Sequence, residues 1–475
     1  MASSMREIPR IVIAGVSSGV GKTTVSVALA RALVARGLRV ALFKCGPDYL
    51  DPTYHARALG HATHNLDGWM MGREAVLGTF LEGTRDADVA IIEGVMGLFD
   101  GASPTGEEGS TAEIAKWLEA PVALVVDSGG MARSFAALVA GFVGFDPELR
   151  VAGAIANRVG SRGHAELLQR TLRSSAFFGA LPRDAAPAFP ERHLGLRTAD
   201  EHVLPESVLE AWGGVAAEWL RLDALLDVAR SAPALRDELL APRERSNSVR
   251  VRIGVAEDEA FHFYYVDNLR RLEALGATLV RFSPLHDARL PEVDGLYLGG
   301  GYPEAHALVL ASNRSMQADV QAFAERGGPI YAECGGLMYL TQAIHTLDGA
   351  RHQMVGLLPT EARMREKLQA LGYVEVETQT RSLLGQKGSR FRGHQFRYSE
   401  LEPEPPPDVV DRAYSLRRRR GGEATREGYV HKNVLASYVH AHWASNPNIA
   451  AGLVEACARF RDDRMRDLEH GERSA

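Results

Sequence analysis

The sequence lacks the features of membrane, secreted and nucleic-acid-binding proteins. No apolar run reaches the roughly 18 residues of a transmembrane helix, and the first residues form no signal segment. Its three cysteines (Cys45, Cys334 and Cys457) are too widely spaced for a disulfide framework or a zinc site. With 54 basic and 60 acidic residues, the net charge of -6 creates no field that collects nucleic acid or anionic lipid. We therefore expect a cytoplasmic protein with neither membrane nor nucleic acid as a partner.

The composition is that of a globular protein with more than one domain. Of the 475 residues, 45% are hydrophobic and 24% are charged, and at about 150 residues per domain this length predicts two or three domains. Short apolar runs alternate with amphipathic stretches, a pattern typical of α/β folds. Near-continuous apolar runs indicate buried parallel strands. In the first half, we expect strands at 10–15, 40–43, 88–94, 121–127 and 151–157.

The α/β pattern stops and then begins again near the middle of the chain. Residues 229–249 are rich in Pro, Ser, Arg and Glu and have no steady period, so we interpret them as a linker. It would join a domain at 1–228 to a second α/β domain at 250–475. Within the second domain, 404–425 resembles a long loop, and its run of arginines at 417–420 is typical of solvated surface. The further strands that we expect are 329–334, 373–378 and 434–442.

A glycine-rich loop joins the first strand to an amphipathic helix. Glycines turn backbone N–H groups toward an anion at a helix N-terminus, the lysine reaches the terminal phosphates, and the following threonine binds Mg²⁺. The first glycine stands one residue early for the usual phosphate-loop spacing, so a tight turn that binds nothing is the alternative. We expect this domain to be a P-loop domain that binds Mg-ATP. The expected nucleotide contacts are Gly15, Ser17, Gly19, Val20, Gly21, Lys22, Thr23 and Thr24.

Acidic residues follow the strands of the same half. Glu93 ends one strand, Asp48 follows another, and Asp100 lies in a glycine-spaced segment. Carboxylates at the carboxyl ends of parallel strands can bind Mg²⁺ beside the phosphates, so we expect Thr23, Glu93 and Asp48 as metal ligands.

Switch and partition ATPases carry a lysine where the glycine-rich loop of this chain has Ser17. In this respect, the loop resembles dethiobiotin-synthetase-like ligases, which use ATP to activate a carboxylate.

The second domain carries a cysteine at the end of a strand, followed by two glycines. We expect a strained turn that exposes the Cys334 thiol, a helix N-terminus that lowers its pKa, and backbone N–H groups at Gly335 that bind an oxyanion. Gly300 and Gly301 end another strand and could add N–H groups. His440 is the expected base, and with His442 it would share one face of a strand. The alternatives are a buried structural cysteine and, for the two histidines, a zinc site.

These motifs together resemble a known family. CGGLMYL and the late YVHAH are similar to class I glutamine amidotransferases, in which a cysteine releases ammonia from glutamine. Joined to GPDYLDP, EGVMGLFDG, RHLGL, GGGYPE and RGHQFRYS, they resemble the cobyrinic acid a,c-diamide synthase family over nearly the full chain. The resemblance implies ATP- and glutamine-dependent amidation of the a- and c-acetate carboxylates of a corrin ring, through an acyl phosphate. It leaves open whether that ring carries cobalt.

The resemblance also assigns residues. Cys334 and His440 match the amidotransferase pair, while Lys22, Thr23, Glu93, Asp48 and Asp100 match the ATP, metal and carboxylate region. Tyr49 and Leu50 match positions that border the substrate, Gly300, Gly301 and Gly335 line the glutamine site, and Asn157 faces the adenine. The departures are His442, where many relatives have a glutamate, and Gln395, another position where glutamate is common.

Other functions are weighed against this one. Cobyric acid synthase, which amidates other corrin side chains, has a similar design, but RHLGL and GPDYLDP favour the a,c-diamide enzymes. A P-loop switch ATPase with a binding module would need neither the cysteine nor the histidines, and a tetrapyrrole carrier would need neither site. The partners that we expect are small molecules, namely glutamine and corrin carboxylates. The oligomeric state stays open, with a homodimer as one option.

Overall fold

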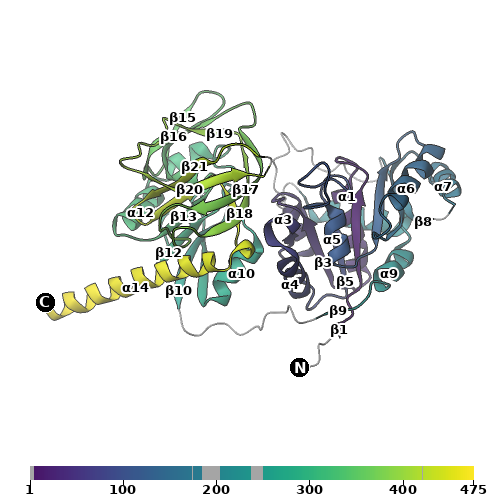
Figure 1. Cartoon of the computed structure of the whole chain (residues 1–475), viewed down its shortest axis with the longest axis horizontal. Helices are drawn as coiled ribbons and strands as arrows, with labels where there is room; N and C mark the ends of the chain where they lie inside the picture. The colour runs from purple at the N-terminus through teal and green to yellow at the C-terminus, as the bar shows by residue number, and fades with distance from the viewer. Residues whose placement is uncertain (1–4, 174, 184–203, 237–249, 420, 475) are drawn as a thin grey trace. The chain divides into compact units, whose positions relative to one another are not determined.

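The computed structural model describes residues 5–173, 175–183, 204–236, 250–419 and 421–474, with the side chains of the last helix described to 467. The chain divides into two compact units, Met1–Pro242 and Arg243–Ala475 (Figure 1). Both are α/β, which confirms the expected fold class. In the described part of the chain, no helix combines the length and the apolar character that crossing a membrane requires. The RHLGL motif at 192–196 lies outside the described residues.

The first unit is built on a seven-stranded sheet in the order β4-β3-β5-β2-β6-β7-β8. Every neighbouring pair runs parallel, so the carboxyl ends of all the strands lie along one edge of the sheet. The five expected strands correspond to β2, β3, β5, β6 and β7. The strands are β2 Arg10–Gly15, β3 Val40–Cys45, β4 His64–Leu66, β5 Val89–Glu93, β6 Val122–Asp127, β7 Val151–Val159 and β8 Ala176–Pro182.

Helices follow the strands and bury the sheet. Alternate residues of β2, Ile11 and Ile13, pack against Leu33 of α1, Trp212 of α8 and Leu225 of α9 in one hydrophobic core. Helix α1 begins directly after the glycine-rich loop, and buried side chains such as Val25, Leu29 and Leu33 pack it into this core. The helices are α1 Lys22–Ala35, α2 Asp51–Leu59, α3 Gly68–Met71, α4 Arg73–Gly83, α5 Thr111–Trp117, α6 Arg133–Phe145, α7 Arg162–Thr171, α8 Glu206–Trp219 and α9 Leu222–Arg230.

Part of the expected linker has regular structure. Helix α9 continues to Arg230, because Leu225, Leu226 and Ala229 bury one face of it. Strand β9 (Leu235–Arg236) then pairs antiparallel with β1 (Met5–Arg6). Residues 237–249 lie outside the described part of the chain.

The second unit contains a ten-stranded mixed sheet in the order β11-β10-β12-β13-β22-β21-β20-β17-β18-β23. The first five strands in this order, from β11 through β10, β12 and β13 to β22, run parallel to their neighbours. From β22 onward, each neighbouring pair is antiparallel. The strands are β10 Val251–Ala256, β11 Ala277–Phe282, β12 Gly295–Leu298, β13 Ile330–Glu333, β17 Ala370–Thr378, β18 Arg390–Arg397, β20 Asp411–Arg418, β21 Thr425–His431, β22 Val434–Ser437 and β23 His440–His442.

A smaller sheet and several helices complete this unit. The four-stranded sheet has the order β15-β14-β16-β19. It comprises β14 Thr341–His345, β15 Arg351–Gln353, β16 Leu358–Met364 and β19 Ser399–Glu402. The helices are α10 Val266–Ala274, α11 Ala307–Ser312, α12 Arg314–Glu325, α13 Gly335–Leu340, the short 3-10 helix Trp443–Ser445 and the long α14 Asn448–Ser474, which extends well past the sheet of its own unit in Figure 1.

Two expectations for the second unit were wrong. The stretch 404–425 is not a loop: β20 occupies 411–418, and its buried Ala413, Tyr414 and Leu416 pack in the core. The expected strand 434–442 is two strands, β22 and β23, which lie at opposite ends of the antiparallel part of the sheet. Only Tyr438 and Val439 separate them. This part of the sheet must therefore curl until its two ends nearly meet, which brings His440 close to the strand that carries Cys334.

Candidate active sites

The glycine-rich loop lies between β2 and α1 of the first unit. Gly19 and Gly21 have left-handed backbones, with φ of 77° and 89°, a conformation that costs glycine nothing. A side chain at Gly21 would collide with the amide nitrogen of Asn157, which donates to the Val20 carbonyl at 2.8 Å. The Asn157 side chain thus supports the loop from β7, and its contact with adenine stays a prediction. Val20 is buried, Ser17 is exposed, and Thr24 lies in the first turn of α1.

The ammonium group of Lys22 points back into the loop. Its Nζ donates to the carbonyl of Ser17 at 3.2 Å and to that of Met96 at 2.6 Å. Burial and the nearby charge of Lys44 together lower the pKa of Lys22 to about 8, against the opposing influence of nearby carboxylates. A lysine held by two neutral carbonyls lacks the charge compensation that phosphate oxygens would supply. This observation fits the expected role of the loop.

Glu93 connects the loop to the neighbouring strands. Its fully buried carboxylate accepts from Thr23 Oγ1 at 2.7 Å, from Lys44 Nζ at 2.9 Å and from His55 Nε2 at 2.6 Å. Burial is the largest single influence and raises the pKa of this carboxyl group, but the Lys44 ammonium and the contact with His55 together outweigh it, so the net pKa of Glu93 is lowered. The structure thus places two of the expected metal ligands, Thr23 and Glu93, side by side.

Lys44 and His55 were missed in the sequence. Lys44 is 2% exposed and pairs with Asp51 at 2.6 Å as well as with Glu93. Although burial disfavours its charge, the carboxylates of Asp51 and Glu93 raise its pKa above the ordinary value. The available signal was a lysine inside the apolar run VALFKC, where an unpaired charge would be costly. His55 carried no comparable signal, because α2 had no expected role in the site.

The remaining acids shape loops near this cluster. Asp48 Oδ1 accepts from the backbone N–H groups of Leu50 and Asp51, at 2.8 and 3.0 Å, and burial raises its pKa to about 6. Asp100 accepts from Gly97 N at 2.9 Å and contributes its charge to the surroundings of Lys22. Tyr49 is buried and Leu50 is half-buried at the start of α2. The expected metal and substrate roles of these four residues stay predictions.

The residues around Thr23 fit a magnesium–nucleotide complex. Mg²⁺ commonly takes one or two protein oxygens and completes its shell with water and phosphate, and the adjacent Thr23 hydroxyl and Glu93 carboxylate offer such oxygens. No cluster of three or more histidine, cysteine or acidic residues that could hold a metal occurs among the described residues. A Mg²⁺ ion that binds together with a nucleotide does not require such a cluster, because phosphate and water supply its other ligands.

In the second unit, Cys334 lies at the turn between β13 and α13. Its φ of 46° is unusual for a residue with a side chain, so the backbone is held in a strained turn as expected. Its N–H donates to Ser437 O at 2.7 Å, and its thiol lies 3.9 Å from the Phe396 carbonyl. The expected lowering of the thiol pKa was wrong: burial, with the charge of Glu304, raises the pKa of Cys334 to about 12. Helix α13, which follows the cysteine, has only six residues.

Two glycine segments lie between the cysteine and the histidine. A methyl group on Gly335 would lie 3.0 Å from Gly301 N, and one on Gly300 would collide with the ring of His440. The structure therefore brings together four expected site residues, Gly300, Gly301, Gly335 and His440, around the turn that carries Cys334. The Gly300 carbonyl accepts from the N–H groups of His262 and Phe263, both at 3.0 Å, which fixes this segment.

The two histidines of β23 are buried and neutral. Burial lowers the pKa of His440 to about 3 and that of His442 to about 4. The ring of His440 stacks on His394, with centroids 5.0 Å apart, and His442 packs against Tyr265 at 4.6 Å. Tyr265 and His394 are hydrogen-bonded at 3.0 Å, so one aromatic pair contacts both histidines. A neutral imidazole beside a thiol can act as a general base.

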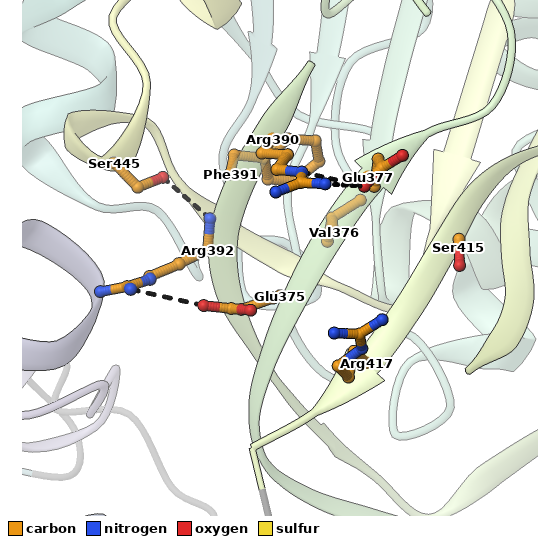
Figure 2. Close-up of a pocket in the computed structure, with 9 residues that line it drawn as sticks. All are labelled: Glu375, Val376, Glu377, Arg390, Phe391, Arg392, Ser415, Arg417 and Ser445. Carbon is orange, nitrogen blue, oxygen red and sulfur yellow. Dashed lines mark hydrogen bonds and ion pairs between the residues drawn. The ribbon is translucent and has the colours of Figure 1, made fainter. Parts of the chain in front are cut away.

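A surface hollow elsewhere in this unit contains none of the expected site residues. About 420 Å³ in volume, it lies over β17, β18 and β20, and Figure 2 shows arginines and glutamates facing one another across these strands. Glu375 and Arg392 are opposite each other in the sheet register, as are Glu377 and Arg390, and both pairs form ion pairs. Cross-strand charge pairs of this kind stabilise an exposed sheet face.

Comparisons with known proteins agree with this geometry. The CobQ/CobB/MinD/ParA nucleotide binding domain family matches residues 11–196, and the CobB/CobQ-like glutamine amidotransferase domain family matches 252–448. The chain is 50% identical over 455 residues to "Cobyrinate a,c-diamide synthase" of Leptospira interrogans serogroup Icterohaemorrhagiae serovar copenhageni, covering 95% of this chain and 99% of that protein. Proteins of the same name from Syntrophotalea carbinolica and Dehalococcoides mccartyi are 49% and 42% identical, covering 94% and 95% of this chain and 98% and 99% of theirs. The chain belongs to the cobyrinate a,c-diamide synthase family.

Proposed function

We propose that this protein uses ATP and glutamine to amidate the a- and c-acetate carboxylates of cobyrinic or hydrogenobyrinic acid in cobalamin biosynthesis. The observation that carries the proposal is the presence of two different sites in one chain. One is a phosphate loop with Thr23 hydrogen-bonded to Glu93. The other is a strained cysteine turn whose Gly335 packs against Gly301, with the buried, neutral His440 against the adjacent Gly300. The names of the relatives supply the substrate.

In the first unit, the chain holds and orients phosphates. The loop N–H groups and Lys22 would bind the phosphate oxygens, and Thr23 and Glu93 would hold Mg²⁺. Bound Mg²⁺ supplies charge that stabilises phosphoryl transfer. Transfer to a substrate carboxylate converts a poor electrophile into an acyl phosphate with a good leaving group. Lys44, Asp48 and Asp100 would surround the place where that carboxylate meets the phosphate, and Tyr49 and Leu50 would border the ring.

In the second unit, the chain releases ammonia from glutamine. His440 takes the thiol proton as Cys334 Sγ attacks the side-chain amide carbon, while N–H groups at Gly300, Gly301 and Gly335 stabilise the oxyanion. His440 then returns the proton to the departing ammonia. Water hydrolyses the thioester to glutamate, and ammonia displaces phosphate from the acyl phosphate to give the amide. We also propose a cytoplasmic location, because the reaction consumes ATP and glutamine.

The mass of the product tests this function. The purified chain is incubated with Mg-ATP, glutamine and, in parallel, cobyrinic acid or hydrogenobyrinic acid. We expect two amidations on one ring with ADP released in step, and the faster substrate identifies the metal state of the ring. Glutamine hydrolysis without amidation of either ring would refute the substrate. Amidation of other side chains would instead support cobyric acid synthase activity, which the names of the relatives do not favour.

A further inference from the structure

Glu333 is a buried carboxylate that the mechanism above does not use. It is the last residue of β13, directly before Cys334, and it is fully buried. Its Oε1 accepts from Tyr331 OH at 2.5 Å, and its Oε2 accepts from Tyr297 OH at 3.1 Å. Burial raises its pKa to about 7. A carboxyl group at such a position costs free energy that an apolar side chain would not, so its presence calls for a reason.

Its third hydrogen bond reaches the strand of the base. Glu333 Oε1 accepts from the backbone N–H of Ala441 at 3.1 Å, and Ala441 stands between His440 and His442 in β23. One carboxylate therefore connects the residue before the nucleophile with the residue after the base. The two lie 108 positions apart in the chain.

Strand β23 depends on such side-chain contacts. It has three residues and pairs through its backbone with one strand, β18. Its other edge is held by side chains: Glu333 accepts from Ala441 N, and Asn268 Nδ2 donates to Ala441 O at 2.8 Å. Asn268 Oδ1 also accepts from Trp443 N at 2.9 Å. Buried backbone groups at such an edge need partners, and Glu333 supplies the acceptor.

The His440 ring is closely packed, so the position of β23 determines where the ring lies. Its ring lies over Gly300, where even a methyl group would collide with it, and against His394 on another side. A shift of β23 by a fraction of an ångström would therefore alter the distance between the imidazole and the thiol rather than be absorbed by free space. Misplacing a catalytic group by about 1 Å can cost about 100-fold in rate.

We infer that Glu333 is a positioning residue for glutamine hydrolysis, whose carboxylate oxygen holds the strand of His440 in register with the turn of Cys334. This inference rests on the proposed amidotransferase function. In this inference, the effect of Glu333 depends on a hydrogen-bond acceptor at a fixed place and does not depend on the negative charge. The side chain thus orients His440 through the peptide group of Ala441, in a chain that has His442 where many relatives have a glutamate.

Two conservative variants separate position from charge. Glu333→Gln keeps the length and an acceptor oxygen but loses the charge. Glu333→Asp keeps the charge but withdraws it by about one carbon–carbon bond, roughly 1.5 Å. Gln317→Met is the control for loss of a buried polar side chain, since Gln317 is buried and donates to the Leu310 carbonyl at 2.8 Å outside both sites. Each full-length protein is assayed for glutamine hydrolysis and for amidation with free ammonia, after circular dichroism and gel filtration confirm folding.

We expect Glu333→Gln to retain glutamine kcat within about tenfold and Glu333→Asp to lose about 100-fold in kcat with little change in KM. Ammonia-dependent amidation and the Gln317→Met control should match wild type. The reverse order, with the aspartate variant active and the glutamine variant inactive, would show that the charge matters and overturn the inference. Equal activity in both would also overturn it. If the wild-type protein itself releases no glutamate from glutamine, the proposed function fails instead.

Discussion

The two sites are both built at a turn from a parallel strand into a helix, yet their electrostatics are opposite. Around the phosphate loop, Lys44 is paired with Glu93 and Asp51 inside the protein. Its pKa is raised and that of Glu93 is lowered, so both groups are charged. Around Cys334, burial raises the pKa of the thiol to about 12 and lowers that of His440 to about 3, so both are neutral.

The difference follows from what each site must bind. A site for phosphates and carboxylates receives charged ligands, and preorganised opposite charges hold them without reorganisation at the moment of reaction. A site for the neutral amide of glutamine gains nothing from a standing ion pair. It can leave the thiol protonated until substrate is bound and the proton moves to the imidazole. A resting neutral thiol is also less exposed to oxidation, because the thiolate is the reactive form.

The largest expected effect is a loss of activity with glutamine that free ammonia restores, which distinguishes the two sites. Cys334→Ala removes the nucleophile, and we expect glutamine-dependent amidation to fall by about 10⁴-fold or more. Ammonia-dependent amidation should remain, because the phosphate site is untouched. Lys22→Ala should abolish both. Rates with glutamine and with ammonium chloride measure this, and ammonia-dependent amidation by the Lys22 variant would contradict the assignment of the phosphate loop.

Removing the buried cation should damage the stability of the first unit. Lys44→Met leaves Glu93 and Asp51 as buried charges without their partner, and breaking such a pair costs about 3–5 kcal/mol. Lys116→Met is the matched control, because Lys116 forms ion pairs at the surface with Asp146 and Glu107, which are worth less than about 1 kcal/mol. Urea unfolding followed by tryptophan fluorescence is suitable, since Trp69, Trp117, Trp212 and Trp219 report on this unit. Equal losses in both variants would show that the cluster is not charged.

The neutral histidine should determine how kcat/KM for glutamine hydrolysis depends on pH below pH 7. Burial lowers the pKa of His440 from the ordinary histidine value of 6.5 to about 3. The imidazole therefore stays in its neutral, basic form when the pH falls below 6.5. We therefore expect kcat/KM for glutamine, which reports on the free enzyme, to stay constant from pH 7 down to about pH 5. Protonation of Glu333 should not add a limb, because a carboxyl group still offers an acceptor to Ala441. A limb near pH 6.5 would contradict the buried, neutral base.

The smallest expected effect is a proton taken up when the nucleotide binds. Lys22 has a pKa of about 8 without ligand, and phosphate charge favours its protonated form and raises that pKa. At pH 8, binding of Mg-ATP should therefore take up part of a proton, which calorimetry detects as a dependence on the ionisation heat of the buffer. Lys22→Arg is the control, because arginine is charged throughout. The same uptake in that variant would show that another group titrates.

The local patterns predicted more than the long-range ones. A glycine-rich run between a strand and a helix was enough to expect the phosphate loop, and CGG after an apolar run was enough to expect the turn at Cys334. Lys44 could not be placed against Glu93 without the pairing of β3 with β5, in which the two residues are opposite each other. Glu333 and Ala441 meet because the antiparallel strands curl, and nothing near either residue signals that. The thiol pKa was mispredicted because burial depends on the whole unit.

The central claim is that two sites in one chain make one product, and isotope transfer tests it most directly. The protein is given Mg-ATP, its corrin carboxylate substrate and glutamine labelled with ¹⁵N in the side-chain amide. The mass of the ring and the amounts of ADP and glutamate are then measured together. We predict that each amide formed carries the label and that one ADP and one glutamate appear with it. Release of ADP and glutamate without label in the ring would contradict the account.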